Sequence, residues 1–226
     1  MELDLSFHNL TTLEGVDLPE GLLKLDCSFN LLTSLPSLPS TLRILHCGNN
    51  QLTNLPPLPY SLEELDCIHN RLTYLPPLPQ SLTTLRCWNN KLTSLPPLPR
   101  TLDALSCEHN KLTSLPPLPR TLNRLHCRNN RLTNLPPLPR SLTIFYWHNN
   151  QLPHHYYEQS IHKLRILIRI EQLRRAHSIL SRLVADRAAR NIQRMWKRYW
   201  LEPYFDVDRG YRVSQYMLYH QRKLVG

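Results

Sequence analysis

The sequence predicts an α/β solenoid, in which one short unit is copied along most of the chain and an α-helical extension follows. Three observations predict this fold class. Six cysteines recur every 20 residues from Cys27 to Cys127, and leucines keep fixed positions around each of them. Prolines then disappear from Gln159 until Pro203, where leucine, isoleucine, arginine and alanine dominate. A constant period of this length indicates a stacked repeat array.

Each unit is expected to contain one short strand and one extended segment. Leu65 and Cys67 alternate with Glu64 and Asp66, which is the period of a strand with one buried face. The L-P-P-L-P stretch that follows cannot be helical, because proline removes donors and forces the preceding residue into extended geometry. About eight coils, ~4.8 Å apart, are expected to form a curved array with short parallel strands on its concave face. Polyproline-like backbone is expected on its convex side.

The cysteine column is predicted to be structural. Neighbouring thiols would lie within disulfide range, but their Cβ vectors run parallel into the core, which does not suit the disulfide dihedral. No C-x-x-C pair or short Cys/His spacing indicates a metal site. Free thiols would act as small buried apolar groups, and they favour a reducing compartment. The column comprises Cys27, Cys47, Cys67, Cys87, Cys107 and Cys127.

The unit, L-x-x-L-x-C-x-x-N-x-L-T-x-L-P-P-L-P, resembles the leucine-rich repeat, with cysteine in the third leucine position. The resemblance covers roughly residues 3–152, and we assign residues 1–152 to the repeat domain. The unit is similar to the short L-P-x-L-P repeats of secreted bacterial effectors and to those of giant-virus proteins of the mimivirus type. This resemblance implies a curved leucine-rich-repeat array in which each asparagine side chain bonds the backbone of the neighbouring turn. The asparagines are Asn30, Asn50, Asn70, Asn90, Asn110, Asn130 and Asn150.

The two ends of the array depart from the repeat, as caps do. Leu5 replaces the cysteine in the first unit, and two extra residues lie between Leu13 and Leu22. In the last unit Trp147 occupies the cysteine position. We expect this tryptophan to belong to an apolar surface that receives the helix that follows.

Charge divides the chain unevenly. Residues 1–152 carry 12 Lys/Arg and 11 Asp/Glu, a net of +1, whereas residues 153–226 carry 15 and 6, a net of +9. Inside the array, residues 1–99 have 5 basic and 9 acidic residues, and residues 100–152 have 7 and 2. The array is therefore acidic near its start and basic near its end.

No sequence pattern indicates an enzyme. We find no nucleophile elbow, phosphate-binding glycine loop or H-E-x-x-H motif. Bacterial effectors with similar repeats can carry a ubiquitin-ligase domain with a catalytic cysteine, but here no cysteine follows Cys127. His46 and His126 share a column but lie four coils apart, so they cannot share a metal ion. We therefore expect no catalytic residue, cofactor, metal or small-molecule substrate.

Function is expected on the strand face, because solenoids bind partners on this extended surface. Trp88 is the sharpest candidate, because tryptophan is favoured at interface hot spots. Its column is interpreted as facing outward throughout: Ser28, Gly48, Ile68, Trp88, Glu108, Arg128 and His148. We predict a protein partner, host or viral. The predicted partner-binding residues are Asp66, Ile68, Arg86, Trp88, His126, Arg128, Tyr146 and His148.

Two basic columns flank the predicted strands. Both could meet phosphate groups or an acidic protein. The alternative, which we favour at this point, is a solvated charged edge that keeps sheet ends from pairing. The columns are Arg71, Lys91, Lys111 and Arg131 after the asparagines, and Arg100, Arg120 and Arg140 before the strands.

Residues 153–226 are predicted to form a basic helical extension. Its first part is apolar over a wide arc and is expected to pack on the final coil. Beyond Leu180, apolar and basic residues separate onto opposite faces. The later tail resembles A-A-x-x-I-Q-x-x-W-x-x-Y-W tails of giant-virus proteins in Ala188, Ala189, Ile192, Gln193, Trp196, Tyr199 and Trp200.

The segment around Ile192 also resembles the first half of a calmodulin-binding IQ motif, whereas Arg198 and Glu202 depart from the second half. Basic amphipathic helices are typical of calmodulin targets and of acidic membrane surfaces. The alternatives to a protein partner at the strand face are therefore calmodulin-type binding, or attachment to nucleic acid or an acidic membrane. The candidate tail-binding residues are Arg187, Arg190, Ile192, Gln193, Arg194 and Lys197.

The N-terminus lacks a basic stretch followed by a long apolar core. No window approaches about 18 uninterrupted apolar residues. We therefore expect a cytoplasmic protein without a signal peptide or transmembrane segment. If the viral resemblance holds, this compartment is the host cytoplasm or the virus particle.

Overall fold

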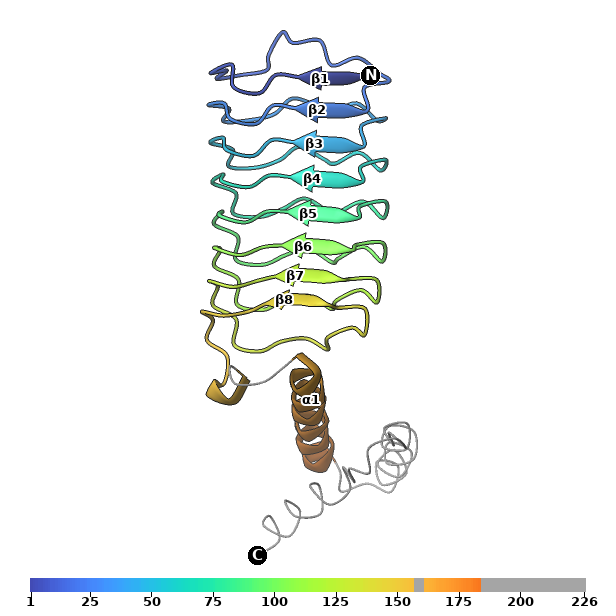
Figure 1. Ribbon diagram of the computed structural model, residues 1–226, viewed down its shortest axis with the longest axis vertical. Helices are drawn as coiled ribbons and strands as arrows, with labels where there is room; N and C mark the ends of the chain where they lie inside the picture. Colours follow the sequence, from blue (N-terminus) through green and yellow to red (C-terminus); the bar gives the residue numbers. More distant parts are fainter. Residues whose placement is uncertain (157–160, 184–226) are drawn as a thin grey trace, which may run out of the picture. The chain divides into compact units, whose positions relative to one another are not determined.

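The computed structural model describes residues 1–156 and 161–183. The chain divides into two compact units, Met1–Arg169 and Ile170–Gly226. The first unit holds a parallel sheet of eight strands stacked in sequence order, so the predicted parallel-strand solenoid is confirmed (Figure 1). The elements are β1 (Glu2–Asp4), β2 (Lys24–Asp26), β3 (Ile44–His46), β4 (Glu64–Asp66), β5 (Thr84–Arg86), β6 (Ala104–Ser106), β7 (Arg124–His126), β8 (Ile144–Tyr146), η1 (His154–Tyr156) and α1 (Ile161–Leu183).

Each coil, numbered by its strand, contributes only three residues to the sheet. The central residue of β2 to β8 is buried and its neighbours are half-exposed or exposed. Leu25 pairs with Leu45, and Leu45 with Leu65, so equivalent positions of successive units lie side by side. In the longer first unit Leu3 still pairs with Leu25. The two extra residues of that unit therefore leave the strand register intact.

Leucine and cysteine side chains fill the space between the strand and the proline-rich side of each coil. In coil 4, Leu62, Leu65, Cys67 and Leu72 have no exposed surface, and the same four positions are closed in coils 5 to 7. Each fully buried leucine contributes about 1.5–3 kcal/mol. The core is a continuous column to which every coil adds an equivalent layer.

One asparagine from each coil completes the backbone hydrogen bonding of the coil before it. Asn70 donates through Nδ2 to the carbonyl oxygens of Cys47 (3.0 Å), Cys67 (3.3 Å) and Ile68 (3.1 Å). Its Oδ1 accepts from the N–H of Leu52 at 2.9 Å. A buried bend without this side chain would leave those backbone groups unpaired. The same four bonds occur at Asn50, Asn90, Asn110 and Asn130.

The residue before each of these asparagines has a left-handed backbone. From coil 2 to coil 8 its φ lies between 47° and 56°. Asparagine or histidine occupies the position from coil 3 onward, as expected of residue types enriched in this conformation. Phe29 occupies it in coil 2 with φ 54°, and Phe7 has φ 58° in coil 1. Bulky residues are outliers in this region, so the first two coils break the pattern.

A second ladder closes the turn before each strand. The hydroxyl of Ser81 lies 2.6 Å from the carbonyl oxygen of Tyr60 and 2.7 Å from that of Leu62, both in the coil before it. Ser61, Thr101 and Thr121 make equivalent pairs of contacts. Each coil therefore supplies a hydroxyl as well as an amide to its predecessor.

After the last coil, a side chain of α1 takes the place of this hydroxyl. Arg165 Nη2 donates to the carbonyl oxygens of Pro139 (2.9 Å), Arg140 (3.4 Å) and Leu142 (2.7 Å). The last two are the carbonyls that a hydroxyl from a ninth coil would reach. The Nη2 group of this guanidinium therefore satisfies backbone acceptors that no further repeat can cover.

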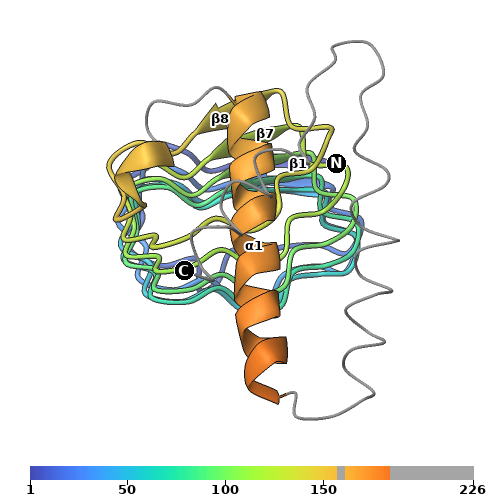
Figure 2. The same cartoon turned by 90° about the horizontal axis from the view of Figure 1, so that it is seen from below.

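The last coil also carries the bulky residues that meet the start of α1. Trp147 is buried and stacks on Phe145 with ring centroids 4.6 Å apart. Leu164 and Ile168 of α1 are buried as part of the same apolar cluster. Seen along the stack, the first turns of α1 lie across the end of the array (Figure 2). The residues of α1 up to Arg169 thus cover the open end of the core column.

The six cysteines are free and buried. Burial raises the pKa of Cys27 to about 12, and it also raises the pKa of each of the other five thiols. The column therefore stays protonated wherever the array is folded near neutral pH.

Removing one amide of the asparagine ladder is expected to destabilise the array. We expect Asn90→Ala to lower the free energy of unfolding by about 2–4 kcal/mol, because it leaves buried backbone groups of Cys67, Cys87 and Leu72 without partners. Urea unfolding followed by circular dichroism measures this change. Ser94→Ala, at an exposed position of the same coil, is expected to change it by less than about 0.5 kcal/mol. Equal effects of the two substitutions would contradict the role given to the amide.

The buried thiols are expected to make the array sensitive to alkali. The ordinary pKa of a thiol is 9.0, so above pH 9 the unfolded chain loses thiol protons that the native state keeps, and stability falls as pH rises. Each thiol contributes a slope of about 1.4 kcal/mol per pH unit. We expect Cys87→Ala to flatten the measured slope by that amount between about pH 10 and 11, while Ser94→Ala leaves it unchanged. Identical slopes of unfolding free energy against pH for Cys87→Ala and the native chain would contradict the prediction.

Candidate functional site

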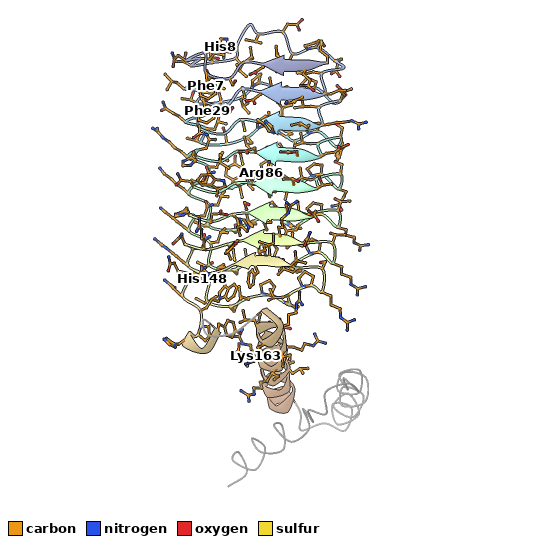
Figure 3. The ribbon with its side chains drawn as sticks, in the orientation of Figure 1. Phe7, His8, Phe29, Arg86, His148 and Lys163 are labelled. Carbon is orange, nitrogen blue, oxygen red and sulfur yellow. The ribbon has the colours of Figure 1, made fainter. Side chains whose placement is uncertain are left out.

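The strand face is formed by the first and third residues of β2 to β8 and by the residue after the cysteine position of each coil. The N–H of every cysteine from Cys27 to Cys127 donates to the carbonyl oxygen of the third strand residue of the next coil, with an N···O distance of 2.8 Å. The backbone beneath the face is thus held at constant intervals. Side chains on this face project from regularly stacked strands, and the residue type at each position changes from coil to coil (Figure 3).

The first half of the strand face carries a linked set of charges. His46 bridges Asp26 (Nδ1 to Oδ2, 3.4 Å) and Glu64 (Nε2 to Oε1, 3.3 Å). Arg86 pairs with Glu64 and reaches Asp66 at 4.0 Å. Three carboxylates thus face one guanidinium and one imidazole, so this half of the face keeps an excess of acid.

The pKa values of the two carboxylates nearest Arg86 are shifted in opposite directions. Burial pushes the pKa of Glu64 upward, but the hydrogen bond and charge of Arg86, aided by His46, hold it below its ordinary value. For Asp66, burial prevails over the N–H of Ile68 and the charge of Arg86, and raises its pKa. The difference follows from position, because Glu64 receives the guanidinium directly and Asp66 lies 4.0 Å from it.

Trp88 lies near the middle of the strand face and is half-buried. Its ring packs edge-on against His69 of the preceding coil, with centroids 4.2 Å apart and planes at 73°. His69 in turn hydrogen-bonds with the side chain of Asn89. The indole is therefore oriented by the array itself, before any partner binds.

The column that contains Trp88 is not exposed along its whole length. Glu108, one coil further, is 8% exposed, and its Oε2 has no hydrogen-bond partner among the described residues. Gly48 is covered by Ile68, because a Cβ at Gly48 would lie 2.8 Å from Ile68 Cγ1. Gly48 and Glu108 are therefore buried although their column belongs to the strand face. Ile68 leans along the sheet and covers Gly48 in the preceding coil.

The second half of the strand face carries basic and aromatic side chains. Arg124 pairs with Asp103 at 3.2 Å. His126 packs edge-on against Tyr146, with ring centroids 4.8 Å apart, and lies 3.8 Å from Glu108. His148 stacks on Trp147 at 5.0 Å. This half is thus an aromatic and cationic surface that adjoins the last coil.

The structure places the predicted partner-binding residues in two groups on one face. The first group lies in coils 4 and 5, and the second in coils 7 and 8, with coil 6 and its buried Glu108 between them. Within each group, neighbouring coils bring side chains into contact. The groups are Asp66, Ile68, Arg86 and Trp88, and then His126, Arg128, Tyr146 and His148.

The predicted tail-binding residues are not placed. Arg187, Arg190, Ile192, Gln193, Arg194 and Lys197 lie outside the described residues, as does the whole IQ-like segment. Of the predicted extension, the structure describes η1 and α1. No helix in the described part of the chain has the length and apolar character needed to cross a bilayer. Nor does any group of three or more His, Cys, Asp or Glu residues in that part have an arrangement that could hold a metal ion.

The structure adds residues that the sequence reasoning missed. His46 and Glu64 belong to the charged network, and Glu108 offers a buried acceptor. The Ser/Thr ladder and Arg165 close the turns. A serine or threonine stands at the same position of every unit from Thr41 to Ser141, and that constancy was a sufficient signal for the ladder. Nothing in the repeat pattern identifies Arg165, because it lies outside the repeats.

No family model and no curated protein matches the chain. Solved structures do match it. YopM from Yersinia enterocolitica is similar with a TM-score of 0.55 and 35% identity over 67% of this chain and 38% of that chain. YopM from Yersinia pestis, described as a leucine-rich effector protein, is similar with a TM-score of 0.63 and 35% identity over 67% of this chain and 50% of that chain.

A leucine-rich-repeat domain of a Shigella effector is also similar, with a TM-score of 0.62 and 36% identity over 69% of this chain and 72% of that chain. The match therefore spans half or less of the two YopM chains, but most of the Shigella domain. These neighbours share the repeat array, and their identity to this chain exceeds what a common fold alone requires.

Removing the guanidinium from the charged network is expected to shift a carboxylate. We expect Arg86→Gln to raise the pKa of Glu64, because the burial that opposes ionisation then loses the guanidinium, which is its main offset. Carbon-13 NMR titration of the glutamate carboxyl groups measures the shift. Arg124→Gln, at the pair with Asp103, is the matched control and is expected to leave Glu64 unchanged. A pKa of Glu64 that stays constant in Arg86→Gln would refute the assignment.

Proposed function

The chain belongs to the leucine-rich-repeat proteins, and from that premise we propose that the solenoid is a non-enzymatic protein-interaction module. Its partner is a protein, and the binding surface is the strand face. The carrying observation is Trp88, an indole held half-exposed at the middle of that face by an edge-on contact with His69 at 4.2 Å. A preoriented tryptophan loses little side-chain freedom on binding, which favours it as an anchor.

The charges around Trp88 define the chemistry of the partner. Glu108, one coil beyond Trp88, is buried, and its carboxylate favours a basic group of the partner over this coil. On the far side of Trp88, the acid excess around Asp66 favours a further basic group. The surface that meets coils 7 and 8 is expected to be acidic or aromatic, to complement Arg128 and Tyr146. A protein with such an uneven charge distribution fits this face in one orientation.

The neighbours support this proposal at the level of class. Their printed names describe leucine-rich effector proteins, and concave repeat surfaces of this kind typically bind macromolecules. The resemblance to giant-virus repeat proteins adds a setting, namely a host or viral protein partner met in the cytoplasm or within the particle.

A second candidate function rests on the +9 charge of residues 153–226. Under it, the tail attaches the protein to nucleic acid or an acidic membrane, or its IQ-like segment binds a calmodulin-type protein. Binding of this electrostatic kind weakens steeply with salt, whereas recognition centred on Trp88 buries apolar surface and persists in moderate salt. Salt dependence thus separates the two.

Trp88→Ala is expected to weaken partner binding by roughly 2 kcal/mol or about 30-fold, as loss of a central anchor does. Affinity capture from lysate at about 0.15 M salt, followed by binding isotherms with the captured protein, measures the change. Tyr60→Ala removes a 93% exposed aromatic outside the strand face and is expected to leave binding unchanged. A captured protein that binds both variants equally, or that is released by nuclease, would disprove the proposal.

A further inference from the structure

We propose that the solenoid has a second binding surface, for single-stranded nucleic acid, on the edge where the chain leaves the strands. We call this the post-strand edge. It consists of the left-handed position that precedes each asparagine and the position that follows it. Phosphates would lie on a cation column, and bases would stack on an aromatic pair. The column is Arg71, Lys91, Lys111 and Arg131, and the pair is Phe7 and Phe29.

The cation column is fixed by the backbone of the array. Each of its residues donates its N–H to a leucine carbonyl of the preceding coil, at 2.9 Å for Arg71, 2.8 Å for Lys91, 2.9 Å for Lys111 and 2.9 Å for Arg131. These bonds set one cation per coil, with a translation of ~4.8 Å between them. All four side chains are exposed. The result is a rigid line of positive charge along four consecutive coils.

Within the described residues no carboxylate pairs with these cations, a property that they share with Arg100, Arg120 and Arg140 of the opposite edge. Lys24, Arg43, Arg86 and Arg124 each pair with a carboxylate. None of the four column residues forms an ion pair within residues 1–156 and 161–183. Like charges on adjacent coils repel, and a polyanion that runs along them relieves this repulsion and releases counterions.

The aromatic pair stands on the same edge, at its acidic end. Phe7 and Phe29 are stacked with centroids 4.3 Å apart and planes at 10°, and they are 70% and 47% exposed. Figure 3 shows the two side by side at one edge of the array. Their φ values of 58° and 54° are ones that later coils give to asparagine or histidine. Strained, exposed aromatics of this kind are typical of binding sites.

Together these features favour nucleic acid over an acidic protein. A single strand offers one anion per nucleotide and a flat base for each aromatic face, which is the combination used by single-strand-binding surfaces. Asn49 and Gln51 link the aromatic pair to the cation column with neutral polar groups. An acidic peptide could neutralise the cations, but it offers a planar group to Phe7 and Phe29 only where it has an aromatic side chain, whereas every nucleotide carries a base.

The first test separates the column from general positive charge. Binding of an oligothymidine of about 12 nucleotides to the full chain is measured by fluorescence anisotropy across a salt series. We expect Lys91→Gln/Lys111→Gln/Arg131→Gln to reduce affinity at least about tenfold and the log–log salt slope by about 2. Arg100→Gln/Arg120→Gln/Arg140→Gln removes the same charge from the opposite edge and is expected to change affinity less than about threefold. Equal losses in both variants, or no binding by the native chain, would overturn the proposal.

The second test separates stacking from charge. Phe29→Asn installs a residue suited to φ 54°, so we expect the unfolding midpoint to stay constant or rise while oligothymidine affinity falls at least about fivefold. Tyr60→Asn is the matched control. Crosslinking with 4-thiothymidine is expected to label peptides that contain Phe7 or Phe29. Unchanged affinity in Phe29→Asn, together with full displacement of the oligothymidine by polyglutamate, would assign the edge to an acidic protein. Crosslinks confined to residues 184–226 would assign binding to the tail. Either result rejects the proposal.

Discussion

The rest of this structure depends on one constraint, which is that each coil must turn sharply with its backbone buried. The asparagine amide meets this constraint by pairing four backbone groups at once, and two of those groups belong to the preceding coil. Asn70, for example, bonds Cys47 and Leu52 as well as its own turn. Because the amide spans two coils, a single coil cannot close by itself. Leucine and cysteine burial then adds stability to a geometry that the amides have already fixed.

Periodicity in the sequence predicts most of the array, because each coil repeats the same local physics. The strand, the buried thiol, the asparagine and the proline-rich return are all legible in one unit, and the extra residues before Leu22 match the longer step along the chain from β1 to β2. Burial of side chains on the strand face is harder to predict from the repeat pattern. The repeat pattern places Glu108 in an outward column, but this residue is buried, because the exposure of a side chain depends on the residues of neighbouring coils, which its own repeat does not encode.

The candidate site is predictable only as a surface, for the same reason. Position in the unit tells which residues share the strand face, so Trp88 and Arg86 can be selected from sequence. It does not tell that His46 joins two carboxylates or that His69 orients Trp88, since those contacts join side chains of neighbouring coils. The two proposed binding surfaces also differ in charge balance. Arg86 and Arg124 on the strand face pair with carboxylates across coils, whereas the cation column of the post-strand edge has no ion pair among the described residues.

Arg165 carries a consequence for how such a chain can change its length. Every coil presents the same unmet carbonyls to whatever follows, and Arg165 meets them for coil 8 as a hydroxyl does for the others. The hydrogen bonds of Arg165 therefore match any coil, whereas the stacked Phe145 and Trp147 are particular to the last one. Recombination that inserts or removes one whole unit leaves each junction with its full complement of partners. The length of the array can thus change by whole repeat units during evolution, while Arg165 continues to cap its last turn.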